Sequence, residues 1–252
     1  MINFLEPPQE QLNSLLECYQ TRRYVDAEKL SLSITEEFPK HPFAWKVLAV
    51  VLKLTGKINE SLVASQKSVQ LDPQDAEAHN TLGILLKEQS RLKEAEASCR
   101  KAIELKPDFA EAHSNLGNIL KEQSRLEEAE ASYRQAIELK PDFAEAHSNL
   151  GNILKEQSRL EEAEASYRQA IALKPDYAEA HSNLGIIFKE SGENQKAKDC
   201  YKKALEIDPL NKKYMVEYGY ILLIFDDKFK GYEYIKKGAG VIKFTPSYSK
   251  II

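Results

Sequence analysis

The stretch Ala110–Phe143, AEAHSNLGNILKEQSRLEEAEASYRQAIELKPDF, decides the fold because the chain goes on to repeat it. Residues 144–177 differ from it at two positions only, and residues 76–109 match it at 27 of 34 positions. Residues 178–211 and 42–75 continue the same frame with more substitutions. A fixed period of this length indicates a repeat architecture, in which stacked copies bury one continuous core.

Each repeat has the spacing of two amphipathic helices. Apolar residues recur every three or four positions on both sides of a polar turn at residues 122–125, which predicts one buried face per helix. The second helix is expected to end at Lys140, because the following Pro141 disfavours helix at the residue before it. Gly117 and Ala129 are small residues on apolar faces. We therefore expect them where the two helices cross.

The conserved spacing of residue types within the repeats resembles that of the tetratricopeptide-repeat family. In residues 110–143 the matching residues are Leu116, Gly117, Leu120, Ala129, Tyr133, Ala136 and Pro141. Residues 144–177 and 178–211 keep this pattern, whereas Cys99 replaces the aromatic residue in 76–109. The resemblance implies an all-α fold, an α-α superhelix. In it, antiparallel helix pairs stack as a right-handed solenoid and the first helices line the concave side.

The predicted organisation has four parts. They are an N-terminal degenerate helix pair over 1–41, five repeats at 42–75, 76–109, 110–143, 144–177 and 178–211, a degenerate C-terminal helix pair over 212–238, and a tail or linker over 239–252. Residues 212–225 are apolar nearly all round, so we expect that helix to be buried. The apolar 212–252 end is expected either to be capped by the tail, or to meet a second copy or a downstream domain.

Composition and charge argue against several classes of partner. The net charge is −4 and the body of the chain has no basic stripe, so nucleic acid is not an expected partner. No apolar run approaches the ~20 residues that a membrane-spanning helix needs. The three cysteines are odd in number and far apart, which is typical of reduced thiols in a cytoplasmic protein.

The sequence contains no recognisable constellation for chemistry. Four histidines, His79, His113, His147 and His181, recur at one repeat position. Because packed helices lie ~8–10 Å apart, two of them cannot share a metal whose ligands sit ~2 Å away. There is no glycine-rich phosphate loop, nucleophile elbow or Cys-x-x-Cys motif. We therefore expect no metal, no cofactor and no enzymatic activity.

Polar residues left over from the apolar stripes form a second stripe on each first helix. The candidate partner-binding residues are Asn80, Lys87, Asn115, Asn118, Lys121, Asn149, Asn152, Lys155, Asn183 and Lys189. Asparagine is a poor residue for a helix interior, so its recurrence requires a reason. An amide can pair with the backbone of an extended peptide, because it both donates and accepts hydrogen bonds. The alternative is that these amides bond to neighbouring repeats or to water.

The asparagine row also resembles the repeat arm of the O-linked N-acetylglucosamine transferases. That resemblance implies a ladder that holds peptide backbone at Asn115, Asn149 and Asn183, with Thr81 breaking the row. The leading hypothesis is thus a protein–protein interaction scaffold that binds an extended peptide or partner protein in its concave groove. The alternative is the substrate-recognition arm of a larger modifying enzyme, a transferase or oxygenase, whose catalytic domain is not in this chain. Bacterial chains with near-identical repeats often carry such a domain downstream.

Overall fold

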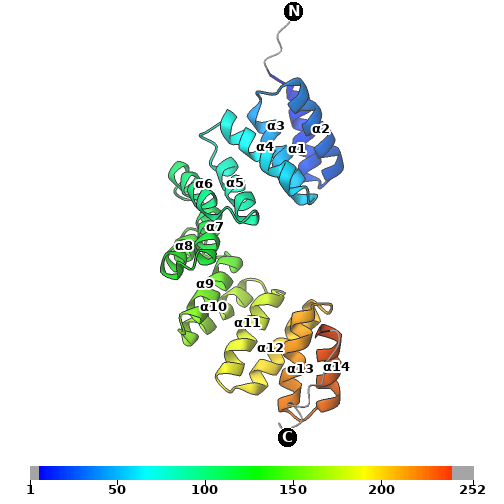
Figure 1. Ribbon diagram of the computed structural model, residues 1–252, viewed down its shortest axis with the longest axis vertical. Coiled ribbons are helices and arrows are strands. Elements are labelled where there is room, and N and C mark those ends of the chain that lie inside the picture. Colours follow the sequence, from blue (N-terminus) through cyan, green and yellow to red (C-terminus); the bar gives the residue numbers. More distant parts are fainter. Residues whose placement is uncertain (1–5, 240–252) are drawn as a thin grey trace, which may run out of the picture. The chain divides into compact units, whose positions relative to one another are not determined.

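The computed structural model describes residues 6–239, and over that range the chain forms α-helices joined by short turns (Figure 1). The helices are α1 (Gln9–Gln20), α2 (Tyr24–Glu37), α3 (Pro42–Leu54), α4 (Ile58–Leu71), α5 (Ala76–Glu88), α6 (Leu92–Leu105), α7 (Ala110–Glu122), α8 (Leu126–Leu139), α9 (Ala144–Glu156), α10 (Leu160–Leu173), α11 (Ala178–Glu190), α12 (Asn194–Ile207), α13 (Lys212–Ile224) and α14 (Lys228–Ala239). The described residues contain no strand. The predicted all-α fold class is therefore confirmed.

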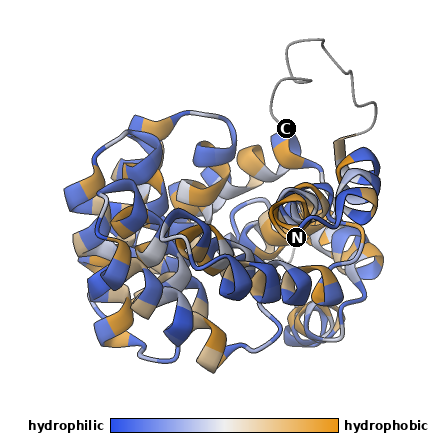
Figure 2. Ribbon diagram, turned by 90° about the horizontal axis from the view of Figure 1, so that it is seen from below, coloured by the Kyte–Doolittle hydropathy of each residue, from blue (hydrophilic) through white to orange (hydrophobic). Residues whose placement is uncertain are grey.

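The chain divides into two compact units. The N-terminal unit, residues 1–139, contains α1 to α8, and the C-terminal unit, residues 140–252, contains α9 to α14. Within each unit consecutive helices pack as antiparallel pairs, and each pair packs on the next. Figure 2 shows hydrophobic and hydrophilic residues alternating along the helices. This alternation is expected for helices that each bury one face.

The turn inside each helix pair repeats one backbone feature. One residue per turn has a positive φ, between 57° and 80°, at positions spaced by 34 residues. These residues are Arg22, Gly56, Ser90, Ser124, Ser158, Gly192 and Asp226. In the turn after α7, the N–H of Arg125 donates to the carbonyl of Leu120 at 2.9 Å, which ends the helix on a left-handed residue. The same local geometry therefore extends to the degenerate pairs at both ends of the chain.

The glycine of each Leu-Gly dipeptide makes room for a ring from the second helix of its pair. A Cβ atom added at Gly117 would lie 2.8 Å from the ring of Tyr133, and one at Gly151 would lie 2.7 Å from Tyr167. Both tyrosines are fully buried. In residues 76–109 the sulfur of Cys99 takes this place against Gly83. The prediction that Gly117 lies where the two helices cross is confirmed.

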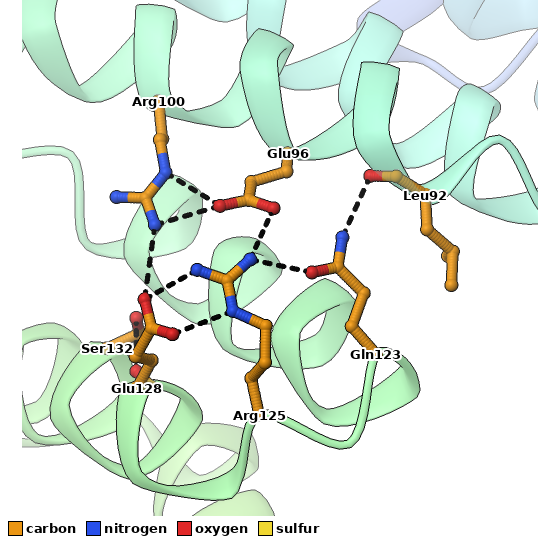
Figure 3. Close-up of polar contacts among 7 residues, drawn as sticks. All are labelled: Leu92, Glu96, Arg100, Gln123, Arg125, Glu128 and Ser132. Atoms are coloured by element: carbon orange, nitrogen blue, oxygen red, sulfur yellow. Dashed lines mark hydrogen bonds and ion pairs between the residues drawn. The ribbon is translucent and has the colours of Figure 1, made fainter.

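Neighbouring pairs are joined differently on their two sides. First helices contact the next first helix directly, as in α3 with α5, α5 with α7, and α9 with α11. Near the second helices, a charged network connects α6 with the start of α8 (Figure 3). Arg125 donates to Glu96 at 2.7 Å and forms two bonds to Glu128, while Arg100 pairs with Glu96 at 2.9 Å. These carboxylates are therefore held by arginines.

The expectation that residues 212–225 are buried all round is wrong in part. Ile221 and Leu222 are buried, but Tyr220, Ile224 and Phe225 are 49%, 54% and 40% exposed. Among the described helices α13 packs against α12 and α14, so one of its faces has no helix over it. The predicted tail lies outside the described residues, apart from Ala239 at the end of α14. No helix in residues 6–239 has the length and apolar character needed to span a bilayer.

Candidate functional site on the first helices

All the predicted partner-binding residues lie on first helices of the pairs. Within each unit we call the surface formed by these helices the first-helix face of that unit; it comprises α1, α3, α5 and α7 in the N-terminal unit, and α9, α11 and α13 in the C-terminal unit. Asn80 and Lys87 lie on α5, Asn115, Asn118 and Lys121 on α7, Asn149, Asn152 and Lys155 on α9, and Asn183 and Lys189 on α11.

In the N-terminal unit, two of the predicted asparagines meet across neighbouring repeats. Nδ2 of Asn115 donates to Oδ1 of Asn80 at 2.9 Å, although the two residues are 35 positions apart. Asn118 accepts a 2.9 Å hydrogen bond from the hydroxyl of Tyr133, the ring that packs on Gly117. Asn80 is 8% exposed. The amides on α5 and α7 are thus connected to each other and, through Tyr133, to the core.

The C-terminal unit repeats this arrangement with a different pair of amides. Nδ2 of Asn183 donates to Oδ1 of Asn152 at 3.0 Å. The same oxygen accepts a 2.8 Å bond from the hydroxyl of Tyr167. Asn183 is 4% exposed, whereas Asn152 is half-buried. Burial raises the pKa of Tyr167, so this hydroxyl remains a donor across the physiological range.

These amide–amide bonds leave hydrogen-bonding capacity on the face. An asparagine side chain offers two N–H donors and a carbonyl acceptor. Within the described residues, Asn115 and Asn183 each use one N–H in the bonds given above. Asn115 is half-buried, so part of its side chain lies at the surface, whereas Asn183 is only 4% exposed and joins α11 to α9. Of these two amides, Asn115 is therefore the more accessible to a ligand.

Two of the predicted lysines connect neighbouring first helices. Nζ of Lys87 lies 3.1 Å from a carboxylate oxygen of Glu122 on α7, and Nζ of Lys189 lies 3.2 Å from Glu217 on α13. Glu217 occupies the repeat position of Asn183 on the next first helix and was not among the predicted residues. Exposed ion pairs of this kind contribute ~0–1 kcal/mol each. A ligand could compete for these lysines at little energetic cost.

Each tyrosine–asparagine hydrogen bond joins residues 15 positions apart. Repeats in which one or both of these residues are substituted lack the bond. In residues 76–109, Ile84 and Cys99 replace both partners. In residues 178–211, Ile186 replaces the asparagine but Tyr201 remains, and its buried hydroxyl has no partner within the described residues. The replacement of both partners in residues 76–109 is visible in the sequence, although its physical meaning required the structure.

The four recurring histidines position loops. Nε2 of each lies 3.0–3.1 Å from the carbonyl of the proline six residues earlier. Because a carbonyl can only accept, Nε2 carries the proton in this contact. Each histidine thus holds the loop that precedes its helix. No group of three or more histidine, cysteine, aspartate or glutamate side chains in residues 6–239 could hold a metal ion.

The fold and this face define a class: a solenoid of helix pairs that presents a polar surface on its first helices. A family model described as "TPR repeat" matches residues 117–158 and 151–192. Two models described as "Tetratricopeptide repeat" match residues 76–109 and 178–211, and residues 98–131. Together these matches run without a gap from residue 76 to residue 211, more than half of the 252 residues. The chain belongs to the tetratricopeptide-repeat family.

Solved structures share the fold at low sequence identity. Pseudomonas aeruginosa pilF has a TM-score of 0.70 at 21% identity, covering 77% of this chain and 88% of its own. YrrB, described as a TPR protein with an unusual peptide-binding site, has a TM-score of 0.55 at 21% identity and coverages of 81% and 96%. The hetero-tetramer Cut9–Hcn1 of the APC/C has a TM-score of 0.78 at 15% identity, covering 89% of this chain and 44% of the other. No curated protein sequence matches the chain.

Proposed function

We propose that the chain is a protein–protein interaction scaffold whose first-helix face binds an extended peptide through the peptide main chain. The observation that carries the proposal is the recurrence of amides that bridge neighbouring first helices, Asn80 with Asn115 and Asn152 with Asn183. Membership of the tetratricopeptide-repeat family supports the scaffold role. YrrB, a structural neighbour, is described as having a peptide-binding site.

The spacing of the first helices suits a peptide backbone. Packed helices lie ~8–10 Å apart and an extended chain rises ~3.3 Å per residue, so ~3 peptide residues span one repeat. An amide can accept from a main-chain N–H and donate to a main-chain carbonyl, whichever side chains the peptide carries. Two of the four predicted lysines, Lys87 and Lys189, are already paired with glutamates. Recognition of a strongly charged motif is therefore less well supported than recognition of the backbone.

The groups that could perform chemistry are engaged elsewhere or are unreactive. The network of Arg125 and Arg100 holds Glu96 and Glu128. Burial raises the pKa of the Cys99 thiol to about 12 and that of Cys200 to about 11, so neither is a thiolate near neutral pH. We therefore propose that the chain does no chemistry itself and, because its three cysteines are free thiols, that it works in the cytoplasm.

Peptide display selection tests the proposal, followed by affinity measurements on the selected peptides. Asn115→Thr tests the N-terminal unit, and Asn149→Thr with Asn183→Thr tests the C-terminal unit. Threonine is a suitable replacement because Thr81 occupies this repeat position naturally. A matched control is Gln135→Ala on the second helix α8. We expect the threonine variants to fold and to lose at least tenfold in affinity. Unchanged affinity in all of them would reject the amide row as the binding element.

A further inference from the structure

The N-terminal unit has a partly open pocket on its first-helix face that none of the predicted residues line. It lies between α1, α3 and α5 and has a volume of about 210 Å³. Its apolar lining comes from Leu16, Tyr19, Phe43, Val47 and Val50. Leu16 is 39% exposed, so part of this apolar lining is open to solvent. The pocket therefore presents apolar surface where a ligand can reach it.

The repeat register shows that this lining departs from the rest of the face. Phe43, Val47 and Val50 lie two repeats before Glu111, Asn115 and Asn118, at the same repeat positions. Positions that carry a carboxylate and two amides on α7 are thus all apolar on α3. In the proposed function, the near-identical repeats offer side-chain amides to the main chain of a peptide. This pocket instead offers an apolar surface to a side chain. A ligand that runs along the face meets a different surface here.

The rim of the pocket carries excess negative charge. Nζ of Lys46 lies 2.9 Å from both Asp75 and Glu77. The Asp75 side chain is only 20% exposed and also caps α5 by accepting from the N–H of Ala78, so it is fixed in place. The Glu77 side chain lines the pocket and is 63% exposed. One ammonium shared by two carboxylates leaves a net charge of about −1 at the mouth. The whole unit is also acidic, with 22 Asp and Glu against 17 Lys and Arg.

We infer that this pocket anchors one leucine- or phenylalanine-sized side chain of a peptide ligand, next to a basic residue that meets Glu77. The inference rests on the proposed function and specifies its ligand. A cavity of ~150 Å³ with apolar walls holds a benzene ring, so about 210 Å³ has room for one such side chain. Sites for drug-sized molecules are larger, at ~300–1,000 Å³. Size and charge together thus favour a single anchor residue with a positive neighbour.

Methyl NMR of the full chain tests the inference with defined probes. The probes are N-acetyl-Leu-Lys-amide, N-acetyl-Ala-Lys-amide and N-acetyl-Leu-Glu-amide, and the signals are the methyl groups of Leu16, Val47 and Val50. We expect Leu-Lys to shift these methyls saturably. The Ala probe should bind about tenfold more weakly because it buries less apolar surface. The Glu probe should bind about threefold more weakly at low salt because it meets Glu77.

Two variants assign these effects to the pocket. Val50→Phe fills the cavity and should abolish the shifts at Val47, while Glu77→Gln should remove the Lys-over-Glu preference and keep the Leu-over-Ala preference. Thr81→Phe serves as a second filling variant if Val50→Phe fails to fold.

Three outcomes would overturn the inference. They are equal binding of all three probes, shifts that persist in the filled variants, and shifts that appear on raising the protein concentration alone, which would identify a second copy as the occupant. Because these probes are too short to need the amide row, the inference can fail while selected peptides still depend on Asn115.

Discussion

Two buried tyrosines in the C-terminal unit offer a matched test of the hydrogen bonds behind the first-helix face. Both rings are fully buried, and both pack on a glycine of the paired first helix. The hydroxyl of Tyr167 donates to Asn152 at 2.8 Å, whereas the hydroxyl of Tyr201 has no partner within the described residues. Replacing each tyrosine by phenylalanine removes one oxygen and keeps the ring. We predict that Tyr167→Phe destabilises the protein and that Tyr201→Phe stabilises it.

The magnitudes follow from the cost of buried polar groups. Tyr167→Phe removes a hydrogen bond with a net value of about 1 kcal/mol, and Asn152 keeps its bond from Asn183. Burying a hydroxyl without a partner costs ~1–3 kcal/mol, so Tyr201→Phe should recover about 1 kcal/mol. The two variants should differ by about 2 kcal/mol in the free energy of unfolding. For a chain of this size that corresponds to roughly 4–8 °C in melting temperature.

Urea titration gives the free energies, and amide hydrogen exchange in α9 to α12 shows where they act. The local measurement matters because a solenoid unfolds through nearest-neighbour terms and need not melt as one unit. Ile186→Asn supplies the acceptor that the Tyr201 hydroxyl lacks. Its effect on the free energy of unfolding should therefore be more stabilising in the chain with Tyr201 than in the Tyr201→Phe variant. Equal destabilisation by Tyr167→Phe and Tyr201→Phe would refute the assignment of a satisfied and an unsatisfied hydroxyl.

Three further predictions concern the turns, the helix crossings and the charged network. Ser124→Gly should stabilise by up to about 1 kcal/mol in urea titration, because Ser124 has a φ of 60° and glycine adopts that conformation without strain. Gly151→Ala should destabilise by ~1–3 kcal/mol in the same assay, because its Cβ would lie 2.7 Å from the ring of Tyr167; a neutral result would mean that the ring moves freely. Burial raises the pKa of Glu96, but hydrogen bonds, including those from two arginines, outweigh it and hold the pKa below its usual value of 4.5. Its stabilising contribution is therefore present above pH 4.5 and is lost as the pH falls through the lowered pKa. In thermal melts, the melting temperature should therefore fall less on acidification for Arg125→Ala than for the unmodified chain.

The fold was predictable from the sequence because the same spacing of residue types recurs in successive repeats. A period of 34 residues with helical spacing leaves few architectures open. The frame at the two ends was harder to recognise. At the N-terminal end Leu15 stands at the repeat position of Gly117, so the Leu-Gly dipeptide that marks residues 76–211 is missing. At both ends the left-handed turn position is held by a charged residue, Arg22 or Asp226. Tertiary context imposes that backbone conformation on residues that do not favour it.

The candidate site was only partly predictable. Repeat spacing places Asn115 and Asn183 on first helices, but spacing alone does not tell whether an amide reaches its neighbour. The structure shows that each does so, through different partners. The pocket on α1, α3 and α5 escaped prediction because Val47 and Val50 are indistinguishable in type from ordinary core residues. The exposure of Tyr220 was also not predicted, because the apolar character of a residue does not tell whether another helix packs over it.

The central claim is that the first-helix face reads peptide backbone, and a main-chain methylation scan tests it most directly. A peptide selected against the chain is synthesised with each amide N-methylated in turn, and in parallel with each side chain truncated to alanine. Affinities are then measured by fluorescence anisotropy. The account predicts losses of tenfold or more on methylation at positions ~3 residues apart, with small losses on truncation except at one apolar anchor. Losses that follow the side chains, with methylation tolerated throughout, would contradict it.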